Sequence, residues 1–207
     1  MSINICSVLR NNVNQKEFPD WLYVTRVDME ENDKERGRTT TISSSGCGLC
    51  SAVMVAERLI PEVDFGLKEA IKMSYDTKSN HRIGTDYKRF APAFAEKYGL
   101  DLEMTNDPEH LRYCLRTGGA AVLHVKGDRD GYVGVFSHGG HYVVAISEER
   151  DGRIAVLDPS YTKGKYEEEG RKGLVEMKND VIAICDMQVI IDDTAPAEPS
   201  FYLFWRK

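Results

Sequence analysis

One cysteine, Cys47, stands between two glycines where a polar stretch of serines and threonines gives way to an apolar run over residues 49–60. The run predicts a helix, and the positive end of a helix lowers the pKa of a thiol. Only the thiolate attacks a carbonyl carbon efficiently. Gly46 and Gly48 would let a substrate backbone approach the sulfur. This pattern predicts that Cys47 is a nucleophile.

Two later segments supply a base and an acid. His141 follows Gly139-Gly140 and opens an apolar run that predicts a strand, and Asp158 closes a second such run. The Asp-Gly pair at residues 151–152 predicts a hairpin turn between these strands, which would bring residue 158 near residue 141. His141 would take the thiol proton, and Asp158 would accept the other ring N–H and hold the tautomer. Cysteine, histidine and acid in this order indicate a papain-like thiol hydrolase.

Each of these residues has a competing interpretation, and for Cys47 it is a buried cysteine beside a tight turn. His138 lies in the same segment as His141, but in a polar loop instead of at a strand start. Asp158 precedes Pro159, and Asp-Pro is a common turn opener. Cys50 lies one helical turn after Cys47, where it would pack in the core or form a regulatory disulfide.

Composition limits the class of protein. The chain has 207 residues, 42% hydrophobic and 29% charged, which is enough for one domain with a substantial core. Its net charge of −6 and the absence of a basic run argue against nucleic acid or an anionic membrane as partner. No apolar stretch is long enough to span a membrane, and the first residues lack a signal-peptide pattern. Five scattered cysteines do not form a disulfide framework, so we expect a cytoplasmic protein in which Cys114 and Cys185 are buried.

The elements that must position these residues fall into two halves. Capping and stop signals, such as Asp107-Pro108 and Gly99, predict helices in the first half. The helices are expected over residues 47–60, 66–75, 86–98 and 108–117. Strands are expected over residues 21–25, 100–104, 120–125, 141–146, 154–157, 181–191 and 201–205. Helices followed by antiparallel strands predict an α+β fold, with the nucleophile helix packed on a C-terminal antiparallel sheet. We expect a single domain over residues 1–207, in which residues 1–38 form a polar N-terminal extension or loop region.

The three motifs together resemble the C39-like peptidases of the papain-like superfamily. The resemblance covers about residues 39–160 and implies a papain-like fold, with Cys47 as nucleophile, His141 as base and Asp158 as orienting acid. Two positions depart from the family pattern. Leu49-Cys50 replaces a proline followed by a small or hydroxyl residue, and Thr41 stands where many members carry an oxyanion-binding glutamine. Gln15 lies far upstream. One oxyanion donor is the backbone N–H of Cys47, and the nearby candidates for the second are Thr40, Thr41, Ser43 and Ser44.

The sequence therefore predicts a thiol hydrolase of peptide or other amide bonds that needs no metal and no cofactor. Its substrate is expected to be a peptide or protein, and the acidic net charge favours a basic or neutral one. Two alternatives stay open. The domain could be a papain-like fold with weak catalysis that is used for binding. It could also be a zinc-binding module, because Cys47, Cys50, His138 and His141 make a Cys2His2 set.

Overall fold

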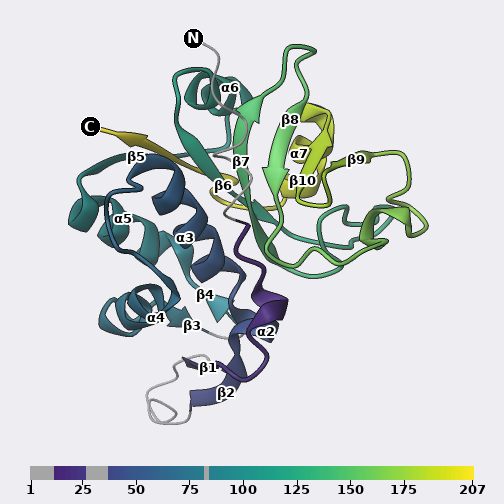
Figure 1. The fold of residues 1–207 in the computed structure, drawn as a ribbon. Coiled ribbons are helices and arrows are strands. Elements are labelled where there is room, and N and C mark those ends of the chain that lie inside the picture. Colours follow the sequence, from purple (N-terminus) through teal and green to yellow (C-terminus); the bar gives the residue numbers. More distant parts are fainter. Residues whose placement is uncertain (1–11, 27–36, 82–83) are drawn as a thin grey trace.

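A seven-stranded antiparallel sheet forms the centre of the C-terminal half of the protein (Figure 1). The computed structural model describes residues 12–26, 37–81 and 84–207. The strand order is β5-β11-β6-β7-β8-β10-β9. The bounds of these strands are Leu100–Thr105 (β5), Ala120–Val125 (β6), His141–Glu148 (β7), Ile154–Leu157 (β8), Val175–Lys178 (β9), Ile182–Cys185 (β10) and Phe201–Arg206 (β11). The architecture is α+β, as the sequence predicted.

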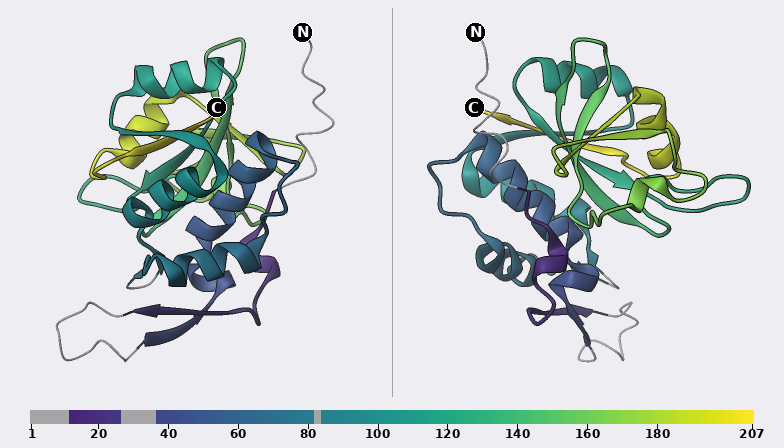
Figure 2. Two further views of the ribbon diagram at one scale, coloured as in Figure 1. Left: turned by 90° about the vertical axis from the view of Figure 1, so that its left-hand side faces the viewer. Right: turned by 45° about the vertical axis from the view of Figure 1, so that its right-hand side comes forward.

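Both faces of the sheet are covered by helices (Figure 2). One face packs against α3 (Cys47–Leu59) and α5 (Tyr87–Tyr98), with α4 (Leu67–Asp76) packed on these two helices. The other face packs against α6 (Pro108–Arg116) and α7 (Met187–Thr194). Alternate residues of one strand supply the two cores because side chains alternate across a strand. On β6, Val122 belongs to the first core and Leu123 to the second. The helix-first, sheet-second pattern of the sequence did not indicate the second layer of helices.

The helix boundaries follow local signals. Asp86 caps α5 by accepting a hydrogen bond from the backbone N–H of Lys88, and Gly99 ends the helix in the left-handed region at φ 65°. Asp107 caps α6 in the same way, with Pro108 at its first turn. These two helices confirm their predicted bounds to within about one residue, as do α3 and α4.

The segment before the nucleophile helix is more structured than its polar sequence predicted. It forms the 3₁₀ helix η1 (Gln15–Glu17), the hairpin β1 (Leu22–Arg26) and β2 (Gly37–Thr41), and the short helix α2 (Ile42–Ser45). The hairpin joins β3 (Asn80–His81) and β4 (Gly84–Thr85) in a second sheet, which extends beyond α4 at one end of the molecule (Figure 2). The rest of the region over residues 1–38 that was predicted as a polar extension or loop, residues 1–11 with Cys6 and residues 27–36, lies outside the described residues.

One predicted strand is wrong in its second half. The apolar run over residues 181–191 is not continuous: β10 ends at Cys185, and α7 begins at Met187 after Asp186. Val189 and Ile190 are buried on the helix instead of on a strand. A short β-branched run does not distinguish a buried strand from a buried helix, and packing onto the second face of the sheet decides for the helix.

Candidate active site

Cys47 is the first residue of α3, directly after the turn that separates α3 from α2. The flanking glycines permit close packing of the chain itself. A Cβ on Gly46 would lie 2.6 Å from the carbonyl oxygen of Ile42, and one on Gly48 would lie 3.0 Å from Cβ of Thr85. The first of these distances is shorter than any ordinary contact, so a side chain at residue 46 would displace α2. The glycines therefore set the geometry of the turn that presents Cys47.

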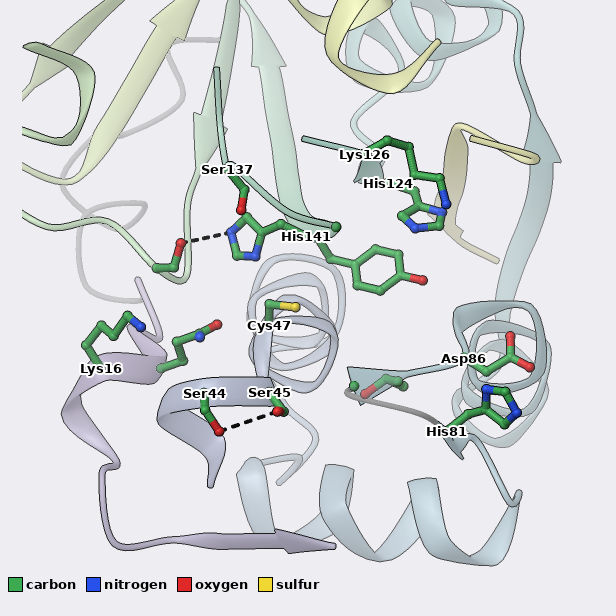
Figure 3. A pocket seen from close by; sticks show the side chains of 16 residues that line it. Lys16, Ser44, Ser45, Cys47, His81, Asp86, His124, Lys126, Ser137 and His141 are labelled. Atoms are coloured by element: carbon green, nitrogen blue, oxygen red, sulfur yellow. Dashed lines mark hydrogen bonds between the residues drawn. The ribbon is translucent and has the colours of Figure 1, made fainter. Parts of the chain in front are cut away.

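His141 and Asp158 meet because β7 and β8 are antiparallel neighbours. Val144 pairs with Leu157, which places the start of β7 and the end of β8 at the same edge of the sheet. His141 Nε2 lies 2.8 Å from Asp158 Oδ1, and both side chains are almost fully buried. The imidazole also faces Cys47 across the opening (Figure 3). The structure thus brings the three predicted residues together.

Electrostatics favour an ion pair between the thiol and the imidazole. Burial would raise the pKa of Cys47, but the charge of His141, a hydrogen bond from its ring and backbone N–H groups of Tyr142 and Gly48 together lower it. Burial would also lower the pKa of His141. The negative charge of Cys47 and the hydrogen bond to Asp158 outweigh burial and raise that pKa to about 9. Each charge thus favours the other, so the arrangement favours a thiolate–imidazolium pair over two neutral groups.

Asp158 holds more partners than a turn residue needs. Its Oδ2 accepts hydrogen bonds from Lys165 Nζ at 2.6 Å and from Tyr166 OH at 2.7 Å. Its Oδ1 accepts the backbone N–H of Ser160 at 2.8 Å in addition to the His141 ring. Burial opposes the ionised carboxylate, but the hydrogen bond and charge of His141, and then Lys165, hold the pKa of Asp158 far below its usual range.

Lys165 and Tyr166 are site residues that the sequence analysis missed. Both lie in the 3₁₀ helix η2 (Lys165–Glu167), and Lys165 is 9% exposed while Tyr166 is 2% exposed. Lys165 Nζ also donates to Ser160 Oγ at 2.8 Å, and that oxygen is 3.1 Å from His141 Nε2. A lysine beside an acidic run looks like solvated surface in sequence, so no local signal identified it.

Gln15, which the sequence analysis set aside because it lies far upstream of Cys47, is also part of the site. It lines the same cleft as Cys47, together with Ser44 and Ser45. Its side chain is 4% exposed, its Nε2 donates to the carbonyl oxygen of Ser43 at 2.7 Å, and its Oε1 has no partner among the described residues. The backbone N–H of Gln15 donates to the carbonyl oxygen of Pro159, which ties η1 to the end of β8.

Thr40 and Thr41 are not part of the cleft. Thr40 donates to the carbonyl oxygen of Tyr23, and Thr41 shares a hydrogen bond with Ser44 at the start of α2. Ser44 lines the cleft, and Ser43 contributes only its carbonyl oxygen to Gln15 and Lys16. As a second oxyanion donor beside Cys47, the Gln15 amide is therefore better placed than any of these hydroxyls.

His138 and Cys50 take structural positions. His138 Nδ1 is 2.9 Å from Asp128 and its Nε2 is 3.2 Å from Glu168, so it joins two loops at the surface. Cys50 is fully buried, and burial raises the pKa of its thiol. In the part of the chain that the structure describes, no group of three or more His, Cys, Asp and Glu side chains is arranged to hold a metal ion. The zinc-binding alternative thus gains no support.

The remaining predicted cysteine placements agree with the structure. Cys114 on α6 and Cys185 on β10 are buried, and burial raises the pKa of each to about 12. Among the described helices, none is long and apolar enough to cross a membrane.

Comparison with known proteins supports the fold. No protein-family model matches the sequence, and no curated protein matches it. A solved structure from Bacillus anthracis, described as a candidate C39-like peptidase, is similar over 78% of this chain and 89% of its own. The TM-score is 0.52 and the sequence identity is 10%. At that identity the likeness establishes a shared fold and leaves family membership and activity as proposals.

Proposed function

We propose that this protein is a thiol hydrolase that cleaves peptide or other amide bonds through an acyl-enzyme on Cys47. The observation that carries the proposal is the buried line from Cys47 through His141 to Asp158, with 2.8 Å between the imidazole and the carboxylate. A buried imidazole between a thiol and a carboxylate has few structural uses, whereas it is the arrangement that activates a nucleophilic cysteine. The similarity to a candidate C39-like peptidase is consistent with it.

The reaction would begin with attack of the Cys47 thiolate on the carbonyl carbon of the scissile amide. The carbonyl π bond opens and its electron pair moves to the oxygen, giving a tetrahedral oxyanion. His141 then donates its proton to the leaving amine as the carbon–nitrogen bond breaks. In the second half, a water gives a proton to His141 and attacks the thioester. Expulsion of the Cys47 thiolate releases the acid and restores the ion pair.

Two donors are available for the oxyanion. The backbone N–H of Cys47 is at the start of α3, and the Gln15 amide nitrogen has a second hydrogen besides the one directed to Ser43. Gln15 would thus perform the role of the oxyanion-binding glutamine that many C39-like peptidases carry at the position of Thr41. The hairpin of β1 and β2 separates Gln15 from Cys47 in sequence, and η1 returns it to the cleft.

The test is hydrolysis of a mixed peptide library by the unmodified protein and by two cysteine variants. Cys47→Ala is expected to abolish cleavage, with an unchanged circular dichroism spectrum. Cys50→Ala is the matched control, because Cys50 is buried one turn along the same helix, and it should retain most of the activity. If Cys47→Ala cleaves as fast as the parent protein, or if only Cys50→Ala is inactive, the proposal is wrong.

A further inference from the structure

The cleft around Cys47 carries a different charge balance from the rest of the molecule. It has a volume of about 670 Å³. The chain has a net charge of −6, yet the described residues that line the cleft include two lysines and one carboxylate, besides Cys47 and His141, whose charges offset each other as an ion pair. Positive charge concentrated in a cleft of an acidic protein attracts anionic groups to that place. The acidic net charge of the chain, which favoured a basic or neutral substrate, therefore does not describe the charge of the cleft.

Part of this positive charge lies at the C-terminal end of β6. His124 and Lys126 project from the end of this strand at one end of the cleft, away from Lys16 (Figure 3). The ring of His124 stacks on Tyr142 with centroids 4.6 Å apart, which fixes its plane. Lys126 is exposed, and within the described ranges no carboxylate forms an ion pair with it.

The pKa of His124 reflects the positive potential at this end of the cleft. Burial, and then the charges of Lys126 and Lys88, lower its pKa to about 4. The ring is therefore neutral at neutral pH. Its Nδ1 is buried without a hydrogen-bond partner among the described residues, which leaves Nε2 as the ring nitrogen that can meet a ligand in the cleft. A neutral imidazole held beside two ammonium groups is suited to donate a hydrogen bond to a carboxylate that those ammonium groups attract.

Asp86, the one carboxylate among the described residues that line the cleft, does not neutralise Lys126. Asp86 accepts the backbone N–H of Lys88 at 3.1 Å as the cap of α5. Its other oxygen lies 3.3 Å from Arg89 Nε. The carboxylate is thus already paired within its own helix.

We infer that His124 and Lys126 form a subsite for a carboxylate of the substrate, so that the enzyme selects acidic peptides. The inference rests on the proposed function for the identity of the reacting bond, but the subsite itself can be tested by binding alone. A carboxylate can come from an Asp or Glu side chain or from the C-terminus of a peptide, and both sources share the chemistry of the site.

The experiment measures binding to the Cys47→Ala variant, in which no substrate is consumed. Short acetylated and amidated peptides that carry one Glu, scanned through every position, are compared with the same peptides carrying Gln. A Gln peptide with a free C-terminus tests the second source of the carboxylate. At least one carboxylate peptide should bind at least about threefold more tightly than its neutral counterpart, with the difference shrinking as salt is added.

The same peptides are then tested on Lys126→Glu in that background, with Lys68→Glu as the control. Lys68 is an exposed lysine of α4 outside the cleft, so the two variants change net charge equally. Only Lys126→Glu should abolish or reverse the preference. Equal binding of charged and neutral peptides, equal effects of the two variants, or no binding of any peptide would each overturn the subsite.

Hydrolysis by the protein with Cys47 intact separates this inference from the proposed function. Tight binding of acidic peptides without cleavage would support the subsite and count against the hydrolase. Cleavage of acidic and neutral peptides at equal kcat/KM would support the hydrolase and count against the subsite.

Discussion

Cys47 and His141 form a coupled pair whose protons cannot be assigned separately. The pKa of the thiol is lowered because the imidazolium is beside it, and the pKa of the imidazole is raised for the reciprocal reason. The thiolate–imidazolium form therefore exists between two limits of pH. It appears as pH rises through the lowered pKa of Cys47, and it is lost as pH rises through the pKa of His141 at about 9.

The rate of alkylation of Cys47 by iodoacetamide measures this pair without a substrate. The rate in the parent protein should already be high at a pH well below the ordinary thiol pKa. His141→Ala removes the stabilising charge and should move the onset to higher pH, and His138→Ala should leave it in place because that ring contacts Asp128 and Glu168. A profile that is unchanged in His141→Ala would show that the two groups are not coupled.

Gln15→Ala should lower kcat for a neutral peptide by roughly 10²–10³-fold if the amide stabilises the oxyanion. Alkylation of Cys47 should keep its rate, because no oxyanion forms in that reaction. Lys16→Ala is the matched control, since Lys16 Nζ also donates to the carbonyl oxygen of Ser43, at 3.1 Å. Equal losses of kcat in the two variants would mean that Gln15 acts by holding Ser43 and not by binding the oxyanion.

At the scale of elements, the site forms where the ends of several helices and strands lie close together. The start of α3, the start of β7, the end of β8 and the 3₁₀ helices η1 and η2 each bring a side chain to one edge of the sheet. The apolar run after Cys47, the apolar strand patterns and the Asp-Gly hairpin turn predicted α3, β7 and β8, and therefore the places of Cys47, His141 and Asp158. No local pattern predicted that η1 would return Gln15 to Cys47, because a whole hairpin lies between them. The change from β10 to α7 escaped prediction for a related reason, since packing on a distant sheet face decides it.

The position of η2 predicts an effect of Lys165 on the alkaline limit of activity. The ammonium of Lys165 offsets part of the negative charge that Asp158 presents to His141. In Lys165→Met the ammonium charge is removed, so the carboxylate of Asp158 stabilises the imidazolium more strongly and the pKa of His141 should rise above about 9. The loss of activity at alkaline pH, which is the falling limb of the pH profile, should then move to higher pH. The measurement is the pH profile of kcat/KM.

Tyr166→Phe is the control for Lys165. It removes a hydrogen bond of 2.7 Å to the same carboxylate oxygen without changing any charge. The falling limb should therefore stay in place in this variant, even where kcat drops because Asp158 is less firmly held. A shift of equal size in both variants would assign the effect to the position of Asp158 and not to the charge of Lys165.

At the scale of the whole molecule, one sheet separates two cores, and every central strand contributes to both. Neighbouring residues such as Val122 and Leu123 lie on opposite faces of β6. The faces share a backbone ladder, so loss of packing on one face should loosen the strand for the other. The expected single domain would then unfold as one cooperative unit, which includes the edge of the sheet that carries His141 and Asp158.

Val122→Ala and Leu123→Ala test this expectation from opposite sides. Each should lower the free energy of unfolding by about 2–4 kcal/mol, because each leaves a cavity in a filled core. Labelling of buried thiols in increasing denaturant reports on the two cores separately, since Cys50 lies in the first and Cys114 in the second, both fully buried. In a cooperative unit, either substitution lowers the protection of both thiols by the same free energy. If Val122→Ala exposes Cys50 while Cys114 keeps its protection, the cores unfold independently, and the helical layer that carries Cys47 can separate from the sheet that carries His141.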